Sequence, residues 1–192
     1  MSPVKFVYII AAVFFFMQIT YGGQNEPDQK TLTTIRSDFY LAVENEDMLN
    51  SLLGLIEMKY DTDANDCPAV ILAYYGALEA MKAKYTFNPY SKFRNVISGI
   101  KKLNAAVSKS DERLEIRFLR FAVLHNIPGI FGVSKERNDD LKVTFEQLLK
   151  KDYSSVSRDL QKGIAEFLMR SDRLEQNQTE SLKLLFPDAA IE

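Results

Sequence analysis

The sequence is poor in the residues that build disulfides, metal sites and cofactor loops. Among its 192 residues there is one cysteine, Cys67, and one histidine, His125. A single cysteine excludes an internal disulfide, so the hydrophobic core alone must hold the fold together. A zinc site needs several histidine, cysteine or carboxylate ligands, and no such cluster surrounds His125. Gly129 and Gly132 lack the lysine and helical context of a phosphate-binding loop. We therefore predict no metal site and no cofactor.

An excess of charge of one sign is also lacking. The chain has 24 basic and 26 acidic residues, and it contains no long run of consecutive basic residues. A nucleic-acid-binding protein normally carries a basic patch that neutralises phosphates, so we predict no nucleic-acid partner. Sustained alternation of apolar and polar residues is absent as well, which argues against a β-sheet.

Residues 1–23 have the pattern of a secretory signal peptide. Lys5 precedes an apolar run over residues 6–19, and small residues follow it. This run is shorter than the ~20 residues that span a bilayer, and polar residues rather than a basic stop signal follow it. We expect cleavage after Gly22 or Gly23 and export to the periplasm or the cell exterior. An uncleaved segment that tethers the protein to the inner membrane is the alternative, and would be its only contact with the membrane.

The segment DTDANDCPAV, from Asp61, resembles the first half of a calcium-binding loop. Asp61, Asp63 and Asn65 stand where oxygen ligands are required, but the loop lacks its glycine at position 6 and its closing glutamate at position 12. The same residues suit a helix start, with Asp66 as the cap and Pro68 in the first turn. We therefore predict the beginning of a helix here.

Apolar residues recur at helical spacing after a short linker over residues 24–30, and predict a single all-α domain over residues 31–192. Residues 31–56 indicate two helices or one bent helix, interrupted at 44–47. Residues 68–85 and 89–107 are expected to form an antiparallel hairpin, since small residues on the first helix allow a close approach. The second helix of the hairpin carries the clearest apolar stripe of the chain, and we expect all of it to be buried: Phe93, Val96, Ile97, Ile100, Leu103 and Val107.

The second half of the chain continues the helical pattern. A capping signal at Ser110 and Asp111 precedes residues 112–126, which are apolar on more than one side and therefore predict a central helix. Residues 127–139 are expected to be a loop. Two more helices follow, the second capped by Ser154 or Ser155, and the apolar tail at 182–186 adds a last turn. The whole is about seven helices, arranged as antiparallel pairs in a short tetratricopeptide-like array or an irregular bundle.

Three segments of the chain resemble a known family. AVILAYYGALEAMKAKYTFNPYSKF, NVISGIKKLNAAV and LEIRFLRFAVLHNIPGIFG, within residues 68–149, are similar to a family of small uncharacterised secreted bacterial proteins with a tetratricopeptide-like helical fold. The family has leucine, glycine and tyrosine after its proline loop, where this chain has Phe131, Gly132 and Val133. The resemblance implies a bacterial exported protein and implies no activity.

The predicted central helix carries the most informative polar pattern. Arg113, Arg117 and Arg120 fall on one stripe, with Glu115 beside them. Arginine binds carboxylates and phosphates through two parallel hydrogen bonds, so the stripe suits an acidic ligand or partner. The alternative is an internal network with acidic residues of neighbouring helices. We favour this network, with Arg117 internal and Arg113 and Arg120 nearer to solvent.

Two further groups of residues are candidates for function. The aromatic residues of the hairpin form a possible binding groove, although their helical spacing is also that of a core: Tyr74, Tyr75, Tyr85, Phe87 and Tyr90. Cys67 and His125 form a possible thiol–imidazole pair, although a lone cysteine is more often a small buried apolar group.

The function that these patterns favour is non-catalytic. We expect an exported helical protein of the bacterial cell envelope that binds a protein or peptide partner. A small envelope hydrolase that uses Cys67 and His125, or a pair of carboxylates without a recognisable motif, is the alternative.

Overall fold

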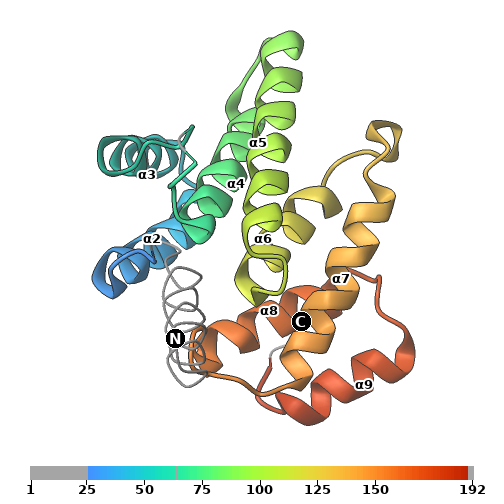
Figure 1. The fold of residues 1–192 in the computed structure, drawn as a ribbon. Coiled ribbons are helices and arrows are strands. Elements are labelled where there is room, and N and C mark those ends of the chain that lie inside the picture. The colour runs from blue at the N-terminus through green and yellow to red at the C-terminus, as the bar shows by residue number, and fades with distance from the viewer. Residues whose placement is uncertain (1–25, 64, 190–192) are drawn as a thin grey trace, which may run out of the picture.

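The computed structural model of the chain describes residues 26–63 and 65–189 (Figure 1). Within these residues every regular element is helical, which confirms the predicted all-α class. The predicted signal peptide lies outside the described residues, and none of the described helices is long and apolar enough to cross a membrane. The elements are α2 (Gln29–Ala42), α3 (Glu46–Lys59), α4 (Ala69–Tyr85), α5 (Pro89–Lys109), α6 (Leu114–His125), the 3-10 turn η1 (Gly129–Phe131), α7 (Ser134–Leu149), α8 (Arg158–Arg170) and α9 (Gln176–Leu185).

Short polar side chains set the starts of the first helices. The Asp28 carboxylate accepts a hydrogen bond from the Thr31 amide at 2.8 Å, so α2 begins at Gln29, within the predicted linker. Asn45 caps α3 in the same way, which separates α2 and α3 into two helices rather than one bent helix. Asn88 caps α5, and Pro89 occupies its first turn, where no amide donor is needed.

The helix start predicted after Asp61 is confirmed, but its cap is not Asp66. The N-cap position of α4 is Pro68, and no side chain caps the helix there. The ammonium group of Lys109, at the end of α5, donates hydrogen bonds to the carbonyl oxygens of Asn65 and Cys67. The start of α4 is therefore stabilised by a side chain from the end of α5, a contact that the local sequence does not predict.

Four expectations for the second half were wrong. The residue that precedes α6 is Arg113 rather than Asp111, and Ser157 rather than residues 154–155 caps α8. Gly132 has a left-handed backbone (φ 69°) that ends η1. This turn lets α7 begin at Ser134, so half of the predicted loop is helical. The tail forms the complete helix α9 rather than a single turn.

The α4–α5 hairpin is antiparallel and closely packed, as predicted (Figure 1). A Cβ atom placed on Gly99 would lie 2.5 Å from the carbonyl oxygen of Gly76 and 2.6 Å from the amide nitrogen of Ala80. Such distances are shorter than van der Waals contact, so only glycine fits where the two backbones meet. The small residues of α4 thus determine the spacing of the hairpin.

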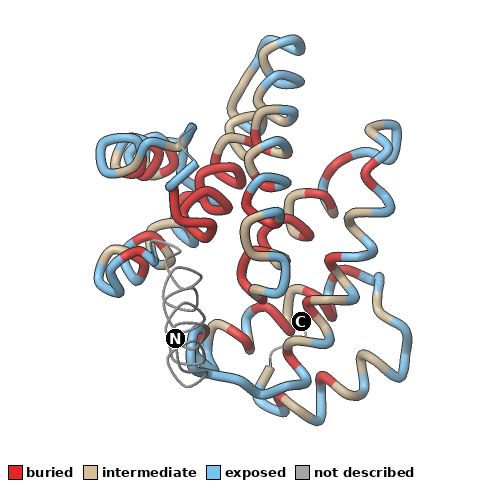
Figure 2. Tube along the Cα trace, viewed as in Figure 1, coloured by how far each residue is buried: buried red, intermediate tan, exposed pale blue. Residues whose placement is uncertain are grey.

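The outer half of the hairpin corrects the prediction that the whole α5 stripe is buried. No residue over 81–98 is buried, as the upper end of the hairpin shows in Figure 2. Phe93 is 54% exposed and Ile97 is 44% exposed, whereas Leu103 is fully buried. The stripe is continuous along α5, but neighbouring helices cover only its inner half.

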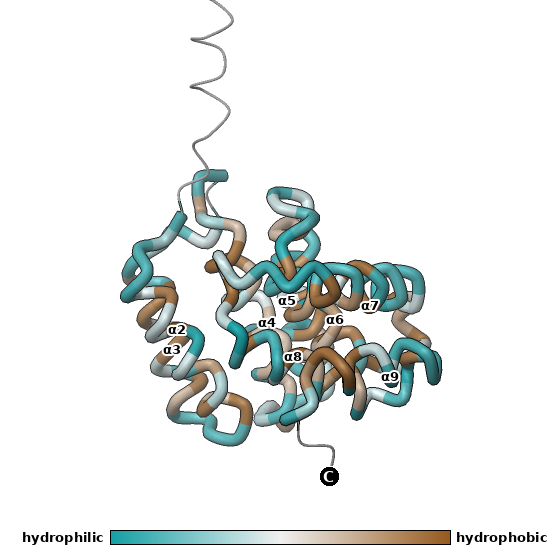
Figure 3. The backbone as a smooth tube through the Cα atoms, turned by 90° about the horizontal axis from the view of Figure 1, so that it is seen from below, coloured by the Kyte–Doolittle hydropathy of each residue, from teal (hydrophilic) through white to brown (hydrophobic). Residues whose placement is uncertain are grey.

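The core consists of two large clusters that meet at α6. The first joins the apolar faces of α2, α3 and α4 with Ile116 and Leu119 of α6. The second joins α7, α8 and α9 with Leu114 and Phe121 of the same helix. Figure 3 shows hydrophobic segments gathered between α5, α6 and α8, with hydrophilic segments on the outer sides of α2, α3, α7 and α9. This confirms the prediction of a central helix that is apolar on more than one side.

Candidate functional site

The polar residues of α6 lie where the two core clusters meet. Because α6 is covered on both sides, its polar side chains must either find partners from other helices or reach solvent at its ends. They do the former, in two separate ionic clusters. One centres on the carboxylate of Glu115 and the other on that of Asp140, and both carboxylates are buried.

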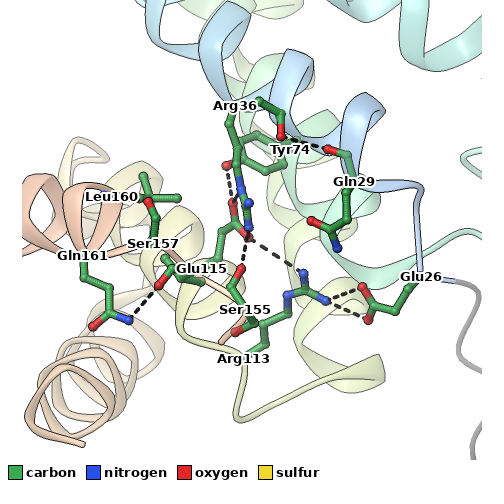
Figure 4. A network of polar contacts seen from close by, with 12 residues as sticks. Glu26, Gln29, Arg36, Tyr74, Arg113, Glu115, Ser155, Ser157, Leu160 and Gln161 are labelled. Atoms are coloured by element: carbon green, nitrogen blue, oxygen red, sulfur yellow. Dashed lines mark hydrogen bonds and ion pairs between the residues drawn. The ribbon is translucent and has the colours of Figure 1, made fainter. Parts of the chain in front are cut away.

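The first cluster joins α6 to α2 and α4 (Figure 4). Both Glu115 oxygens accept hydrogen bonds of 2.7 Å from the Arg36 guanidinium group, and the Tyr74 hydroxyl donates to the same carboxylate. Arg113 lies at the edge of the cluster, 3.9 Å from Glu115, and binds the Glu26 carboxylate at 2.7 and 2.8 Å. Burial beside the Glu115 charge raises the pKa of the Tyr74 hydroxyl well above its usual range, so this hydroxyl stays a donor.

The second cluster joins α6 to α5 and α7. Asp140 accepts hydrogen bonds from Arg117 Nη1 at 2.8 Å and from Arg120 Nε and Nη2 at 2.6 and 2.8 Å. Arg120 also donates to the side-chain oxygen of Asn104 on α5. Arg117 also donates to the backbone carbonyl of Asp111. One carboxylate on α7 therefore neutralises part of the charge of two arginines on α6.

The arginine stripe therefore lies inside the molecule and closes an internal network. The expected order of exposure was wrong in one respect, because Arg120 is the most buried of the three arginines. Its position on α6 faces α5 and α7 together, while Arg117 lies nearer the end of the helix. Tyr74 and Tyr75 are both buried, and the Tyr75 hydroxyl donates to Glu57. Neither tyrosine lines a groove.

Cys67 and His125 are not brought together. Cys67 is buried in the first core cluster, where desolvation raises the pKa of its thiol. His125 packs against Phe121 and Phe167 in the other half of the molecule, and its Nδ1 accepts a hydrogen bond from Arg173. A raised thiol pKa and the absence of a shared contact among the described residues do not suit a nucleophile and its base.

The acidic side chains that resemble calcium ligands have partners within the molecule. The Asp63 carboxylate forms an ion pair with Lys102 of α5, and Asp61 accepts a hydrogen bond from the Asp63 amide. Across the part of the chain that the structure describes, no three histidine, cysteine or acidic side chains gather as a metal site would require.

One large exposed apolar surface lies on the outer half of α5. Its central residues are Tyr90, Phe93 and Ile97, which follow one another at helical spacing. The Phe131 ring of η1 stacks on Phe93 with ring centroids 5.5 Å apart, and the neighbouring Ile130 is 91% exposed. We call these five residues the docking face. An exposed set of this kind in a protein marks an interaction surface more often than single scattered apolar residues do.

Cations border the docking face. Seven basic residues and no acidic ones lie between Glu79 and Asp111: Lys82, Lys84, Lys92, Arg94, Lys101, Lys102 and Lys109. Three of them have partners within the molecule, namely Lys84, Lys102 and Lys109. Arg94 and Lys101 are exposed beside the docking face, and neither forms an ion pair with another described residue. This segment is thus positive in a chain with a net charge of −2.

The sequence pattern did not single out the docking face, because its apolar residues continue the stripe that forms the core. The predicted groove included Phe87 and Tyr90, and these two side chains are indeed exposed, at 101% and 74%. The available signal was charge, since no carboxylate accompanies the seven cations over thirty-one consecutive residues, 80–110.

Comparisons of the chain with known protein families, with curated proteins and with solved structures give no match. The resemblance to secreted tetratricopeptide-like proteins therefore stays a prediction from the sequence.

Proposed function

We propose that this protein is an exported, non-catalytic helical protein of the bacterial cell envelope that binds a protein partner through the docking face. The observation that carries the proposal is the exposure of Tyr90, Phe93 and Ile97 on a well-formed helix, beside Arg94 and Lys101, which are exposed and form no ion pair with another described residue. Aromatic residues with neighbouring arginine are typical of the centres of protein interfaces.

The other candidate residues support this choice because they already have internal partners. Glu115 and Asp140 each hold arginines in buried ion pairs, and a carboxylate so engaged is not free to move protons to or from a substrate. Two shallow hollows lie along α3, over residues 50–62, and neither contains a histidine, a cysteine or an arginine. The docking face combines several exposed apolar side chains with adjacent cations.

The test is site-specific photo-crosslinking in the native host. A photoreactive amino acid replaces Ile97 on the docking face or, as the matched control, Leu184 of α9, which is 84% exposed but isolated. We expect a protein adduct of defined mass at position 97 and none at position 184. The same adducts at both positions, or no protein adduct at position 97, would show that the docking face is not a protein-binding site.

Export is the second part of the proposal, and it rests on Lys5 and the apolar run over residues 6–19. The intact mass of the protein purified from its host tests it. We expect a chain that begins near Gly23 or Gln24. A full-length chain in the membrane fraction would favour the tethered alternative.

A further inference from the structure

The docking face has two chemically different edges. At about 100° per residue, Tyr90 and Ile97 lie on nearly the same line along α5. Phe93 falls on one side of this line, and Arg94 and Lys101 fall on the other. The surface is therefore apolar along one edge and basic along the opposite edge.

The apolar edge continues onto η1, which stands beside α5. Phe93 and Phe131 stack with an angle of 28° between their rings, and Ile130 extends the same surface. Phe131 itself packs, together with Val96 and Ile100 of α5, on a small cluster of Leu124, Ile127 and Val133. Packing against these buried residues fixes the positions of the side chains along the apolar edge.

The spacing of the docking face is that of a helix-packing surface. From Tyr90 to Lys101 the helix rises about 16 Å, or three turns. Further along α5, Leu103 and Val107 are buried against neighbouring elements, about 120° and 80° around the helix from Ile97. The side of α5 that carries Tyr90 and Ile97 is exposed, and no described helix covers it. Since ridges of side chains at this spacing fit the grooves of another helix, the missing neighbour has the shape of a helix.

We propose, on the basis of the proposed function, that the docking face receives an amphipathic helix of the partner protein with acidic residues along one edge. Its apolar side covers Tyr90, Phe93 and Ile97, and its acidic edge pairs with Arg94 and Lys101. Charge complementarity favours an acidic segment, because the docking face has cations along one edge and no carboxylate anywhere in the surrounding segment 80–110.

A protein helix fits this surface better than a lipid surface does. The face is a narrow strip along α5, bounded on one side by η1, and a rod of ~10 Å diameter can lie along such a strip. A flat bilayer would first meet the end of the hairpin, where Phe87 projects, and would attract Lys92 as strongly as Arg94. A helix on the docking face contacts Arg94 and leaves Lys92 in solvent, since Lys92 lies on the far side of α5.

Affinity selection from a library of helical peptides tests the proposal. Every library member keeps one apolar face, while the positions along both edges are randomised, and the target is the full chain. We expect the selected peptides to carry aspartate or glutamate along one edge only. Charge reversal of Arg94→Glu with Lys101→Glu should weaken the best selected peptide by about tenfold or more, because two attractions become repulsions. The matched control, Lys92→Glu on the far side of the same helix, should leave its affinity unchanged.

Three results would overturn the proposal. Selected peptides without acidic enrichment would contradict the charge assignment, and failure to select any peptide would contradict the helical occupant. Sedimentation of the chain with vesicles that contain anionic lipid, lost in Ile97→Ser and in Lys92→Glu alike, would assign the surface to lipid. These results are independent of the test of the proposed function. That function fails if no protein adduct forms at position 97.

Discussion

Removal of the Asp140 carboxylate should destabilise the protein more than any other single change at the ionic clusters. Asp140 is fully buried and accepts three hydrogen bonds from two arginines. In Asp140→Ala, the buried Arg120 guanidinium loses its carboxylate partner, and breaking a buried pair in this way costs about 3–5 kcal/mol. Arg117 adds little to the loss, because it is closer to solvent and keeps the Asp111 carbonyl as a partner.

Urea denaturation, followed by circular dichroism, measures this loss as a lower midpoint with an unchanged slope. A protein of this size should lose about 2–4 °C of melting temperature per kcal/mol, so a fall of roughly 6–20 °C is expected. Asp139→Ala is the matched control, since Asp139 is the exposed neighbour on the same helix.

A second substitution separates the ion pair from simple packing. Asp140→Leu combined with Arg120→Met should recover much of the stability, because apolar residues of similar volume need no partner. A change below about 1 kcal/mol in Asp140→Ala would refute the reasoning, since a surface pair contributes no more than that.

Three further outcomes follow from the fold. Gly99→Ala should lower the free energy of unfolding by about 1–3 kcal/mol, because its Cβ meets the α4 backbone, whereas Gly163→Ala, with open space around it, should be neutral or stabilising in the same urea titration. Ile97→Asp should have a melting temperature close to that of the parent, but in a pull-down it should lose the protein that crosslinks at position 97. Leu103→Asp should fail to fold, because it buries an unpaired charge, as soluble yield and circular dichroism would show. Burial, Arg173 and Arg137 lower the pKa of His125, so the unfolded chain binds its proton more tightly, and stability should fall as the pH drops below the ordinary histidine pKa. His125→Gln should reduce this fall between neutral and mildly acidic pH, and an identical pH profile in the variant would show that His125 makes no contribution.

The sequence alone determined the features that depend on neighbouring residues along the chain. Apolar spacing predicted the helices, and Asn88 with Pro89 predicted the turn of the hairpin, because caps and prolines act within one helical turn. The small residues of α4 predicted the close approach of α5, since backbone contact requires the absence of side chains. Apolar residues on more than one side of residues 114–125 predicted the central position of α6.

The tertiary structure alone decided which surfaces are covered and which charges are paired. Arg36 is 79 residues from its partner Glu115, and Arg120 is 20 residues from Asp140, so no local spacing connects them. Helical periodicity states which residues share a face, but it does not state which neighbour covers that face. For this reason Leu103 and Ile97 belong to the same wide apolar stripe in the sequence, yet Leu103 is in the core and Ile97, about 120° around the helix, lies on the docking face. The α5 helix extends beyond the elements packed against it, and that difference in length leaves half of a core-like stripe in solvent.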